Sequence, residues 1–221
     1  MIEAVIFDLD GVLIDSEQTW NSAREQLVRE RGGTWREEAT REMMGMSSPE
    51  WSRYMRDSLG VDMEPEEIAA EVVRRMEALY RERLPIVDGA RDAVAALSAH
   101  WRLGLASSAN RRLIELVLEL AGMREHFAAA VSAEEMAHGK PAPDVYLEAA
   151  RRIGVQPGLC AAVEDSTNGL RAAASAGMLV IAVPNREFPP TEEAVALAEV
   201  VLESLDQLRP ELLLRLGRRA R

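Results

Sequence analysis

The sequence predicts an α/β fold in which a parallel sheet carries helices on both faces. Short apolar runs, typical of strands buried on both sides, alternate with longer segments whose apolar residues recur at i, i+3, i+4 and i+7. This alternation indicates parallel strands, because each crossover between them needs a connection of helical length. A third feature, a stretch of about 70 residues with helical patterning only, predicts an inserted helical domain.

Strands are expected at six apolar runs. The first, Ala4 to Phe7, is continuous and ends directly at Asp8. The other five lie at residues 103–106, 128–131, 161–163, 180–183 and 200–202. Amphipathic helices are expected around residues 90–97, 113–120, 146–153 and 170–177.

The alternation is interrupted between about Asp15 and Pro85, where no strand is expected. Trp20, Ala23 and Leu27 share one helical face, and turn residues separate several helical segments. We therefore expect a core domain formed by residues 1–14 and 87–221, with a helical domain formed by residues 15–86.

Composition narrows the class of protein. The chain has 26 lysines and arginines against 37 aspartates and glutamates, which gives a formal net charge of −11. Nucleic-acid binding is not expected, because it usually requires a basic patch that neutralises phosphates.

No stretch of about 18 apolar residues suggests a membrane span, and no signal peptide is evident, so a cytoplasmic protein is expected. The single cysteine, Cys160, lies in an apolar run and is expected to be a buried hydrophobe. A monomer is the default expectation.

Two aspartates follow the first predicted strand, in the segment Phe7-Asp8-Leu9-Asp10-Gly11-Val12. Residues i and i+2 of a strand point the same way, so Asp8 and Asp10 can face one small site. Carboxylates so close repel one another unless a cation or a proton lies between them. The alternative is an ordinary Asp-Gly turn after a strand.

Hydroxyl side chains follow the second predicted strand, at Ser107 and Ser108. Either could donate a hydrogen bond to a phosphate oxygen. Either could equally cap the helix that begins near Asn110, so this segment alone leaves both readings open.

The segment Gly139-Lys140-Pro141-Ala142-Pro143-Asp144 contains the only lysine of the chain. Two prolines stiffen the loop, and Asp144 is a plausible N-cap for the following helix. An ammonium group in a stiff loop can act as a point charge on phosphate. A solvated surface lysine is the alternative.

Adjacent acids, Glu164 and Asp165, end the strand predicted at residues 161–163 and precede a hydroxyl-rich turn. Their carboxylates are hard oxygen ligands suited to Mg²⁺, although they could instead compensate the dipole of the following helix. All four segments are expected at the carboxyl ends of strands, where open parallel sheets bind ligands. Their order and placement together indicate one catalytic site.

The order and spacing of these segments resemble the haloacid dehalogenase superfamily, in particular its members with a helical cap inserted after the first strand. Asp8 to Val12 resembles the family's first motif, Ser107 the second, Lys140 the third and Glu164-Asp165 the fourth. The resemblance covers essentially the whole chain. It implies a Rossmann-like core domain, an α-helical cap domain and a phosphoryl-transfer enzyme.

The resemblance also implies catalytic roles. Asp8 is expected to attack phosphorus and form an aspartyl-phosphate, which divides one difficult displacement into two easier steps. Asp10 is expected to protonate the leaving oxygen and then to deprotonate the hydrolytic water. Mg²⁺ is expected as the cofactor, held by the Asp8 carboxylate, the Asp10 carbonyl and Asp165, with Glu164 ligating directly or through water.

By the same resemblance, the phosphoryl group is held by Ser107 and by backbone N–H groups of Leu9, Asp10 and Ser108, with Lys140 balancing its charge. Losing one such donor typically costs about 2.7–4 kcal/mol of barrier.

Asp10 favours phosphate esters over other substrates of the superfamily, because the dehalogenating members lack an acid/base aspartate there and the phosphonate-cleaving members carry alanine. A closer resemblance is to β-phosphoglucomutases. Two positions depart from them: Trp20 stands where they have histidine, and Ser48 where a cap arginine grips a second phosphate. The expected function is therefore hydrolysis of a small phosphorylated sugar or polyol, and a sugar-phosphate mutase is the alternative.

Six residues are expected to contact the leaving group. They are Glu17, Trp20, Gly45, Met46, Ser47 and Asn110. For Trp20 and for the methionines Met43, Met44 and Met46, packing within the cap is an equal alternative.

Overall fold

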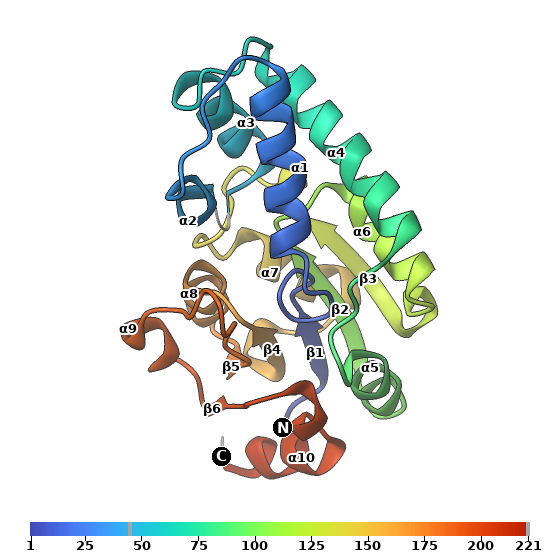
Figure 1. Cartoon of the computed structure of the whole chain (residues 1–221). Coiled ribbons are helices and arrows are strands. Elements are labelled where there is room, and N and C mark those ends of the chain that lie inside the picture. The colour runs from blue at the N-terminus through green and yellow to red at the C-terminus, as the bar shows by residue number, and fades with distance from the viewer. Residues whose placement is uncertain (44–45, 220–221) are drawn as a thin grey trace.

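Six parallel strands form the centre of the molecule, at the apolar runs (Figure 1). The computed structural model describes residues 1–43 and 46–219. The strands are β1 (Ala4–Phe7), β2 (Arg102–Ser107), β3 (Phe127–Ser132), β4 (Cys160–Glu164), β5 (Leu179–Ala182) and β6 (Val200–Val201). Their order in the sheet is β3-β2-β1-β4-β5-β6, so β1 is central and the segments after β1, β2 and β4 lie at one edge. The predicted α/β class is confirmed.

Successive residues of β1 pack on opposite faces of the sheet. Val5 and Phe7 join the hydrophobic cluster that includes α5 (Ala90–Ser98), α6 (Arg111–Leu120) and α10 (Pro210–Arg219). Ala4 and Ile6 join the second cluster, together with α7 (Asp144–Ile153), α8 (Thr167–Ser175) and α9 (Glu192–Val195). Both faces of the central strand are therefore buried, which is why the strands read as continuous apolar runs.

Four helices lie above the sheet, at the end where its strands terminate (Figure 1). They are α1 (Glu17–Glu30), α2 (Ala39–Met43), α3 (Ser48–Asp57) and α4 (Pro65–Glu82). We call this helical block the cap. Within its described residues there is no strand, as its sequence pattern predicts.

The two chain segments that join the cap to the core run side by side. The N–H of Asp15 donates to the carbonyl of Pro85 at 2.8 Å, and the N–H of Val87 donates to the carbonyl of Leu13 at 3.0 Å. Away from these two connecting segments, an ion pair also joins the cap to the core: Arg112 Nη2 of α6 donates to Glu77 Oε2 of α4 at 3.0 Å. The division into domains at residues 14/15 and 86/87 stays a prediction.

Single 3₁₀ turns complete the chain at Arg124–His126, Ala133–Glu135, Pro157–Leu159 and Leu205–Gln207. β3 begins one residue earlier than its sequence pattern indicates, since Phe127 already pairs with Leu103 of β2. The Phe127 ring packs edge-on against Phe7, with ring centroids 6.0 Å apart. The Asp144 prediction is wrong: Asp144 is the first residue of α7, and Pro143, which has no side-chain acceptor, is at the N-cap.

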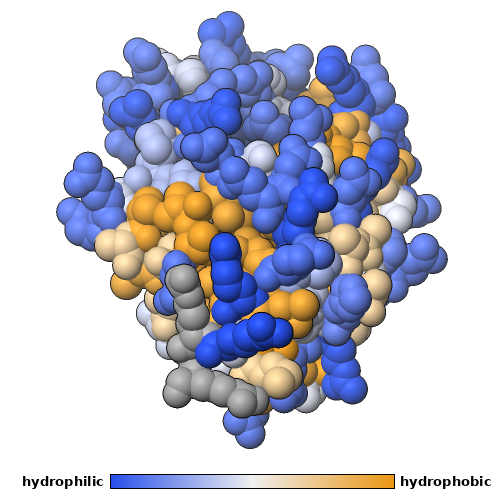
Figure 2. All heavy atoms as spheres, turned by 90° about the horizontal axis from the view of Figure 1, so that it is seen from below, coloured by the Kyte–Doolittle hydropathy of each residue, from blue (hydrophilic) through white to orange (hydrophobic). Residues whose placement is uncertain are grey.

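The opposite end of the molecule carries the N-terminus and α10 (Figure 1). Seen from below, this end shows a patch of hydrophobic residues surrounded by hydrophilic ones (Figure 2). Met1 and Leu214 are largely exposed. Among the described residues, no helix combines the length and the hydrophobicity needed to span a membrane.

The buried sheet gives a direct stability prediction. Ile181 of β5 is fully buried, so Ile181→Ala should lower the free energy of unfolding by about 2–5 kcal/mol through lost burial and a residual cavity. Leu214→Ala, which removes the same kind of apolar side chain from an exposed position of α10, should change it by less than about 0.5 kcal/mol. Urea unfolding of both variants measures the difference, and equal losses would contradict this account of the core.

Candidate active site

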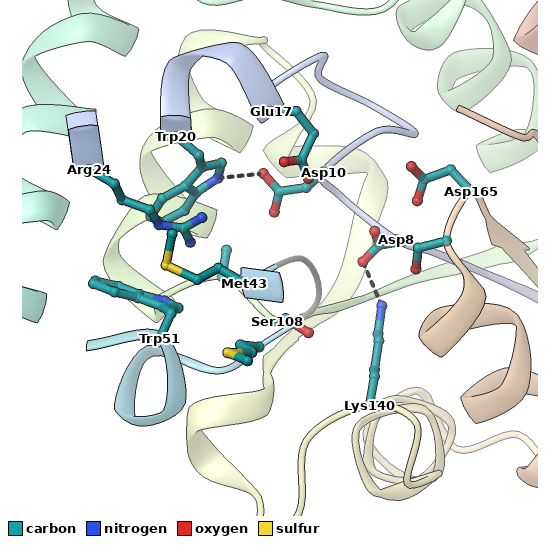
Figure 3. Close-up of a pocket in the computed structure, with 13 residues that line it drawn as sticks. Asp8, Asp10, Glu17, Trp20, Arg24, Met43, Trp51, Ser108, Lys140 and Asp165 are labelled. Atoms are coloured by element: carbon teal, nitrogen blue, oxygen red, sulfur yellow. Dashed lines mark hydrogen bonds and ion pairs between the residues drawn. The ribbon is translucent and has the colours of Figure 1, made fainter. Parts of the chain in front are cut away.

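A cavity of about 70 Å³ lies between the carboxyl ends of the strands and the cap (Figure 3). Its walls come from the segments after β1, β2 and β4, from the loop before α7, and from the cap helices. The lining residues are Asp8, Asp10, Glu17, Trp20, Arg24, Met43, Met46, Trp51, Ser108, Ala109, Lys140, Asp165 and Ser166. The four segments singled out in the sequence therefore meet at one place.

Lys140 is the centre of a buried charge cluster. Its Nζ donates to Asp8 Oδ1 at 2.7 Å, to Glu164 Oε1 at 2.6 Å and to the carbonyl of Ala106 at 3.1 Å. An ammonium group has three N–H donors, so all three are used. The side chains of Lys140, Asp8 and Glu164 are 3%, 8% and 0% exposed, which makes these contacts strong and any loss of one costly.

Glu164 is held by further donors. Its Oε1 also accepts from the Tyr146 hydroxyl at 2.8 Å, and its Oε2 accepts from the backbone N–H groups of Asp165 and Ser166 at 3.0 and 3.2 Å. Ser166 Oγ donates to the same oxygen at 3.2 Å. These contacts hold the Glu164 carboxylate in place, and the carboxylate in turn positions Lys140.

Burial and like charges raise the pKa of the acids in the cluster. Desolvation raises the pKa of Asp8 to about 8, with Lys140 opposing and Glu164 and Asp10 adding to the effect. Desolvation, followed by Glu164 and Asp8, also raises the pKa of Asp165 well above its usual value. For Lys140, burial alone favours the neutral amine, but Asp8 and Glu164 outweigh it and raise the pKa above its ordinary value. If all three carboxylates were ionised, the cluster would carry more negative charge than its one lysine neutralises, and for this reason Asp8 and Asp165 tend to hold protons when no cation is bound.

This excess negative charge fits a divalent cation. One oxygen from each of Asp8, Glu164 and Asp165 lies within 4.8 Å of the other two. A set of buried carboxylate oxygens suits a hard cation such as Mg²⁺. Because Glu164 already accepts from Lys140, Tyr146 and two backbone groups, Asp8 and Asp165 are the better candidates for direct ligands.

Gly11 allows Asp165 to approach the first motif. Its φ is +81°, a region that side chains disfavour, and a Cβ there would lie 1.9 Å from Asp165 Oδ2. The glycine is thus required both for the turn after β1 and for the space that the Asp165 carboxylate occupies.

Asp10 is oriented by the start of the cap. Its Oδ1 accepts from Trp20 Nε1 at 3.1 Å and from the hydroxyl of the buried Ser16. The Asp10 side chain is not part of the three-carboxylate group. The metal contact expected of Asp10 involves its backbone carbonyl instead, and it stays a prediction. Ser16 was not among the expected site residues, since a serine before a helix usually indicates only a cap.

The residues expected to hold phosphate lie close to the cavity. Ser108 lines it. Ser107 does not line it and is fully buried, with its Oγ accepting from the N–H of Ala109 at 3.0 Å. The hydroxyl proton of Ser107 is therefore still available to a further acceptor. The Leu9 side chain is buried in the core, so only its backbone could contribute.

Three of the six expected leaving-group contacts line the cavity: Glu17, Trp20 and Met46. Burial raises the pKa of Glu17 to about 7, with Arg24 opposing that shift and Asp10 and Asp15 supporting it. Gly45 lies outside the described residues.

Ser47 and Asn110 are engaged elsewhere. The Ser47 hydroxyl donates to Glu50 at 2.6 Å in the capping box of α3. Asn110 caps α6 by accepting from the N–H of Arg112 at 2.9 Å, and its amide donates to Glu134 at 2.8 Å. Neither lines the cavity, because local capping uses the polar atoms of both. Contact of these two residues with the leaving group stays a prediction.

Four lining residues were not expected: Arg24, Trp51, Ala109 and Ser166. The first two come from the cap. Trp51 was interpreted as structural, yet it lies in the cavity wall. Arg24 lies one turn after Trp20 on α1 and also faces the cavity (Figure 3). The i, i+4 spacing of Trp20 and Arg24 was the available signal, because such residues share one face of a helix.

Comparison with known proteins agrees with this geometry. The family model of haloacid dehalogenase-like hydrolases matches residues 2–177. Hexitol phosphatase B of Escherichia coli (strain K12) is 35% identical over 219 residues, covering 94% of this chain and 94% of that protein. A crystal structure of a CbbY variant from Rhodobacter sphaeroides in complex with xylulose-1,5-bisphosphate superimposes with a TM-score of 0.84, at 30% identity, covering 94% of this chain and 96% of that one. The β-phosphoglucomutase of Clostridium difficile gives a TM-score of 0.85 at 26% identity, covering 99% and 98%.

The packing behind Glu164 gives a second prediction. A Cβ on Gly169 would lie 1.8 Å from Glu164 Oε1, so Gly169→Ala must displace the carboxylate that holds Lys140. The free energy of unfolding should fall by about 1–3 kcal/mol, the cost of leaving buried polar groups unsatisfied. Gly158→Ala is the matched control, because its Cβ would meet its nearest neighbouring atom only at 3.9 Å. Denaturant unfolding measures both, and an unchanged Gly169→Ala would refute the tight packing.

Proposed function

Because the chain belongs to the haloacid dehalogenase-like hydrolase family, we propose that it hydrolyses the phosphate monoester of a sugar or polyol through a phosphorylated Asp8. The observation that carries the proposal is the buried Asp8–Lys140 contact of 2.7 Å at the end of the central strand, with Asp10 two residues further on. A carboxylate nucleophile, an acid/base group and a fixed cation are the elements that this reaction requires.

In the first step, an oxygen of the Asp8 carboxylate attacks phosphorus, and the bond from phosphorus to the leaving oxygen breaks. The leaving oxygen takes a proton from Asp10, which releases the alcohol and leaves an acyl phosphate on Asp8. Lys140 holds one Asp8 oxygen, so the carboxylate enters the reaction already oriented.

In the second step, water attacks the phosphorus of the acyl phosphate. Asp10 accepts a proton from that water, and the bond between phosphorus and the Asp8 oxygen breaks, giving inorganic phosphate and a free carboxylate. Trp20 and Ser16 hold Asp10 Oδ1 and so support its position in both steps.

Lys140 would balance part of the charge of the phosphoryl group. A cation would be held by Asp8 and Asp165, with Glu164 beside them, and the Asp10 carbonyl is the proposed further ligand. When bound, Mg²⁺ supplies electrostatic stabilisation of the phosphoryl oxygens. The hydroxyl of Ser107 and the N–H groups of Leu9, Asp10 and Ser108 are the proposed donors to those oxygens.

The nature of the leaving group is inferred from the relatives and from the cavity. Hexitol phosphatase B acts on hexitol phosphates by its name, and CbbY was crystallised with a phosphorylated sugar. The Glu17 carboxyl in the cavity wall can accept hydrogen bonds from hydroxyl groups of such a molecule. A small polyhydroxylated phosphate ester is therefore the proposed substrate class.

A mutase is less well supported. The cap position at which β-phosphoglucomutases are expected to carry arginine is Ser48, which is buried in α3 and does not line the cavity. Incubation with hexose phosphates and magnesium, followed by separate measurement of free phosphate and of isomerised sugar phosphate, tests the proposal. Free phosphate as the product supports hydrolysis, whereas isomer without free phosphate would replace it by the mutase.

Asp8→Asn should lower phosphate release by at least about 1000-fold, as loss of a nucleophile does. The variant should melt cooperatively and show the wild-type circular dichroism spectrum, since the amide oxygen can still accept from Lys140. Phosphate release at wild-type rate from the pure variant would exclude Asp8 as the nucleophile.

Removal of metal should abolish phosphate release, and added Mg²⁺ should restore it. Asp165→Asn should raise the Mg²⁺ concentration needed for half-maximal rate, by about tenfold or more, because a ligand charge is lost. Mg²⁺ should also raise the melting temperature of the wild type more than that of Asp165→Asn. Asp62→Asn, an exposed change in the cap, is the control, and equal responses of both variants would argue against a metal at Asp165.

A further inference from the structure

Arg24 is a buried cation in the wall of the cavity. It extends from α1 and is only 6% exposed. Its guanidinium lies 4.7 Å from the ring centre of Trp20 and 5.0 Å from that of Trp51. The two rings are inclined at 61° to one another, so the guanidinium lies against both of them and has few alternative positions.

The hydrogen-bonding capacity of Arg24 is not used within the described part of the chain. No hydrogen bond or ion pair joins its guanidinium to another described residue, and its Nε is buried without a partner. A buried charge without hydrogen-bond partners is expensive, and the two aromatic faces offset only part of that cost. Such an arrangement persists when a ligand provides the missing acceptors.

The acids nearest to Arg24 do not replace those acceptors. Glu17 and Asp10 attract the guanidinium at longer range, with Glu17 the stronger of the two. Burial lowers the pKa of Arg24 to about 10, so the group still carries its positive charge near neutral pH. Asp10 accepts hydrogen bonds from Trp20 and Ser16 instead of from Arg24, and Glu17 lines the cavity.

Arg24 is placed where the far end of a substrate would lie. Figure 3 shows Asp8 and Lys140 on one side of the cavity, Arg24 on the other and Asp10 between them. A leaving group whose ester oxygen is at Asp10 therefore extends toward Arg24. Of the two cations among the described residues that line the cavity, Lys140 is already bound to Asp8 and Glu164, which leaves Arg24 for the leaving group.

We propose that Arg24 binds a second oxyanion, a carboxylate or a phosphate, at the end of the substrate remote from the phosphate that is hydrolysed. The planar fork of the guanidinium matches either oxyanion through two parallel hydrogen bonds. The enzyme thereby selects phosphate esters whose leaving group is itself anionic. This inference rests on the proposed function and refines its substrate class.

Two matched substrate pairs test it. 6-Phosphogluconate and glucitol 6-phosphate differ only in carrying a carboxylate or a hydroxymethyl group at the end remote from the phosphate. Fructose 1,6-bisphosphate and fructose 6-phosphate differ in a phosphate or a hydroxyl group. The wild type should show a kcat/KM at least about tenfold higher for the anionic member of one pair, and the pair that responds identifies the oxyanion.

Arg24→Met keeps an unbranched side chain against the two tryptophans but removes the charge and the fork. It should lower kcat/KM for the preferred anionic substrate about 30-fold more than for its neutral partner. Arg24→Lys, which keeps the charge without the fork, should recover part of that difference. Arg29→Met, an exposed change on the same helix, should alter neither member of the pair.

The outcomes separate the two proposals. If the wild type shows no preference within either pair, or if Arg24→Met lowers kcat/KM equally for both members, Arg24 only packs against the tryptophans and the inference fails. Phosphate release would still support the phosphatase. If no compound releases phosphate, the proposed function fails. Calorimetric titration then decides the inference alone: tighter binding of the anionic member to the wild type, lost in Arg24→Met, supports it, and equal binding overturns it.

Discussion

The buried ammonium of Lys140 is the interaction on which the rest of the site depends. It connects three parts of the chain that are distant in sequence: Asp8 after β1, the carbonyl of Ala106 in β2, and Glu164 at the end of β4. Removing a charged group from water is costly, so this arrangement is stable only if all three acceptors are in place. The parallel sheet meets that condition because adjacent strands end at the same edge. Tyr146 and the turn after β4 then fix Glu164, and Gly169 leaves room for it.

The same cluster explains why a second cation belongs in the site. One lysine faces Asp8, Glu164 and Asp165, and the pKa values of Asp8 and Asp165 rise because burial and mutual repulsion disfavour their charged forms. A bound cation relieves both effects and keeps Asp8 ionised, which is the form a nucleophile requires. Lys140 thus neutralises only part of the charge of the three carboxylates. The remaining negative charge suits the site to bind a cation and to carry out phosphoryl transfer.

The core of this site was predictable from sequence, since each motif follows a strand and strand ends converge in any parallel sheet. Asp8 and Asp165 meet for that reason alone, whereas Lys140 reaches them from the loop between β3 and α7. Cap contacts were less predictable, because polar residues near helix ends have a local use that competes with a ligand. Ser47 and Asn110 serve as caps, whereas Trp51 and Arg24, which lie within helices and have no local polar role, face the cavity. Which face of a cap helix points toward the core depends on tertiary packing, which helical periodicity does not contain.

The first turns of α1 link the two halves of the site. Ser16 and Trp20 hold Asp10, and Arg24 follows one turn later on the same helix, stacked on the same tryptophan. A substrate that binds Arg24 therefore contacts α1, the helix that also carries Trp20 and so helps to orient Asp10. Specificity and catalysis are then coupled, because binding energy from the far end of the leaving group can be used to fix Asp10 beside the ester oxygen. A leaving group too short to reach Arg24 lacks that coupling, so it should be discriminated against in kcat as well as in binding.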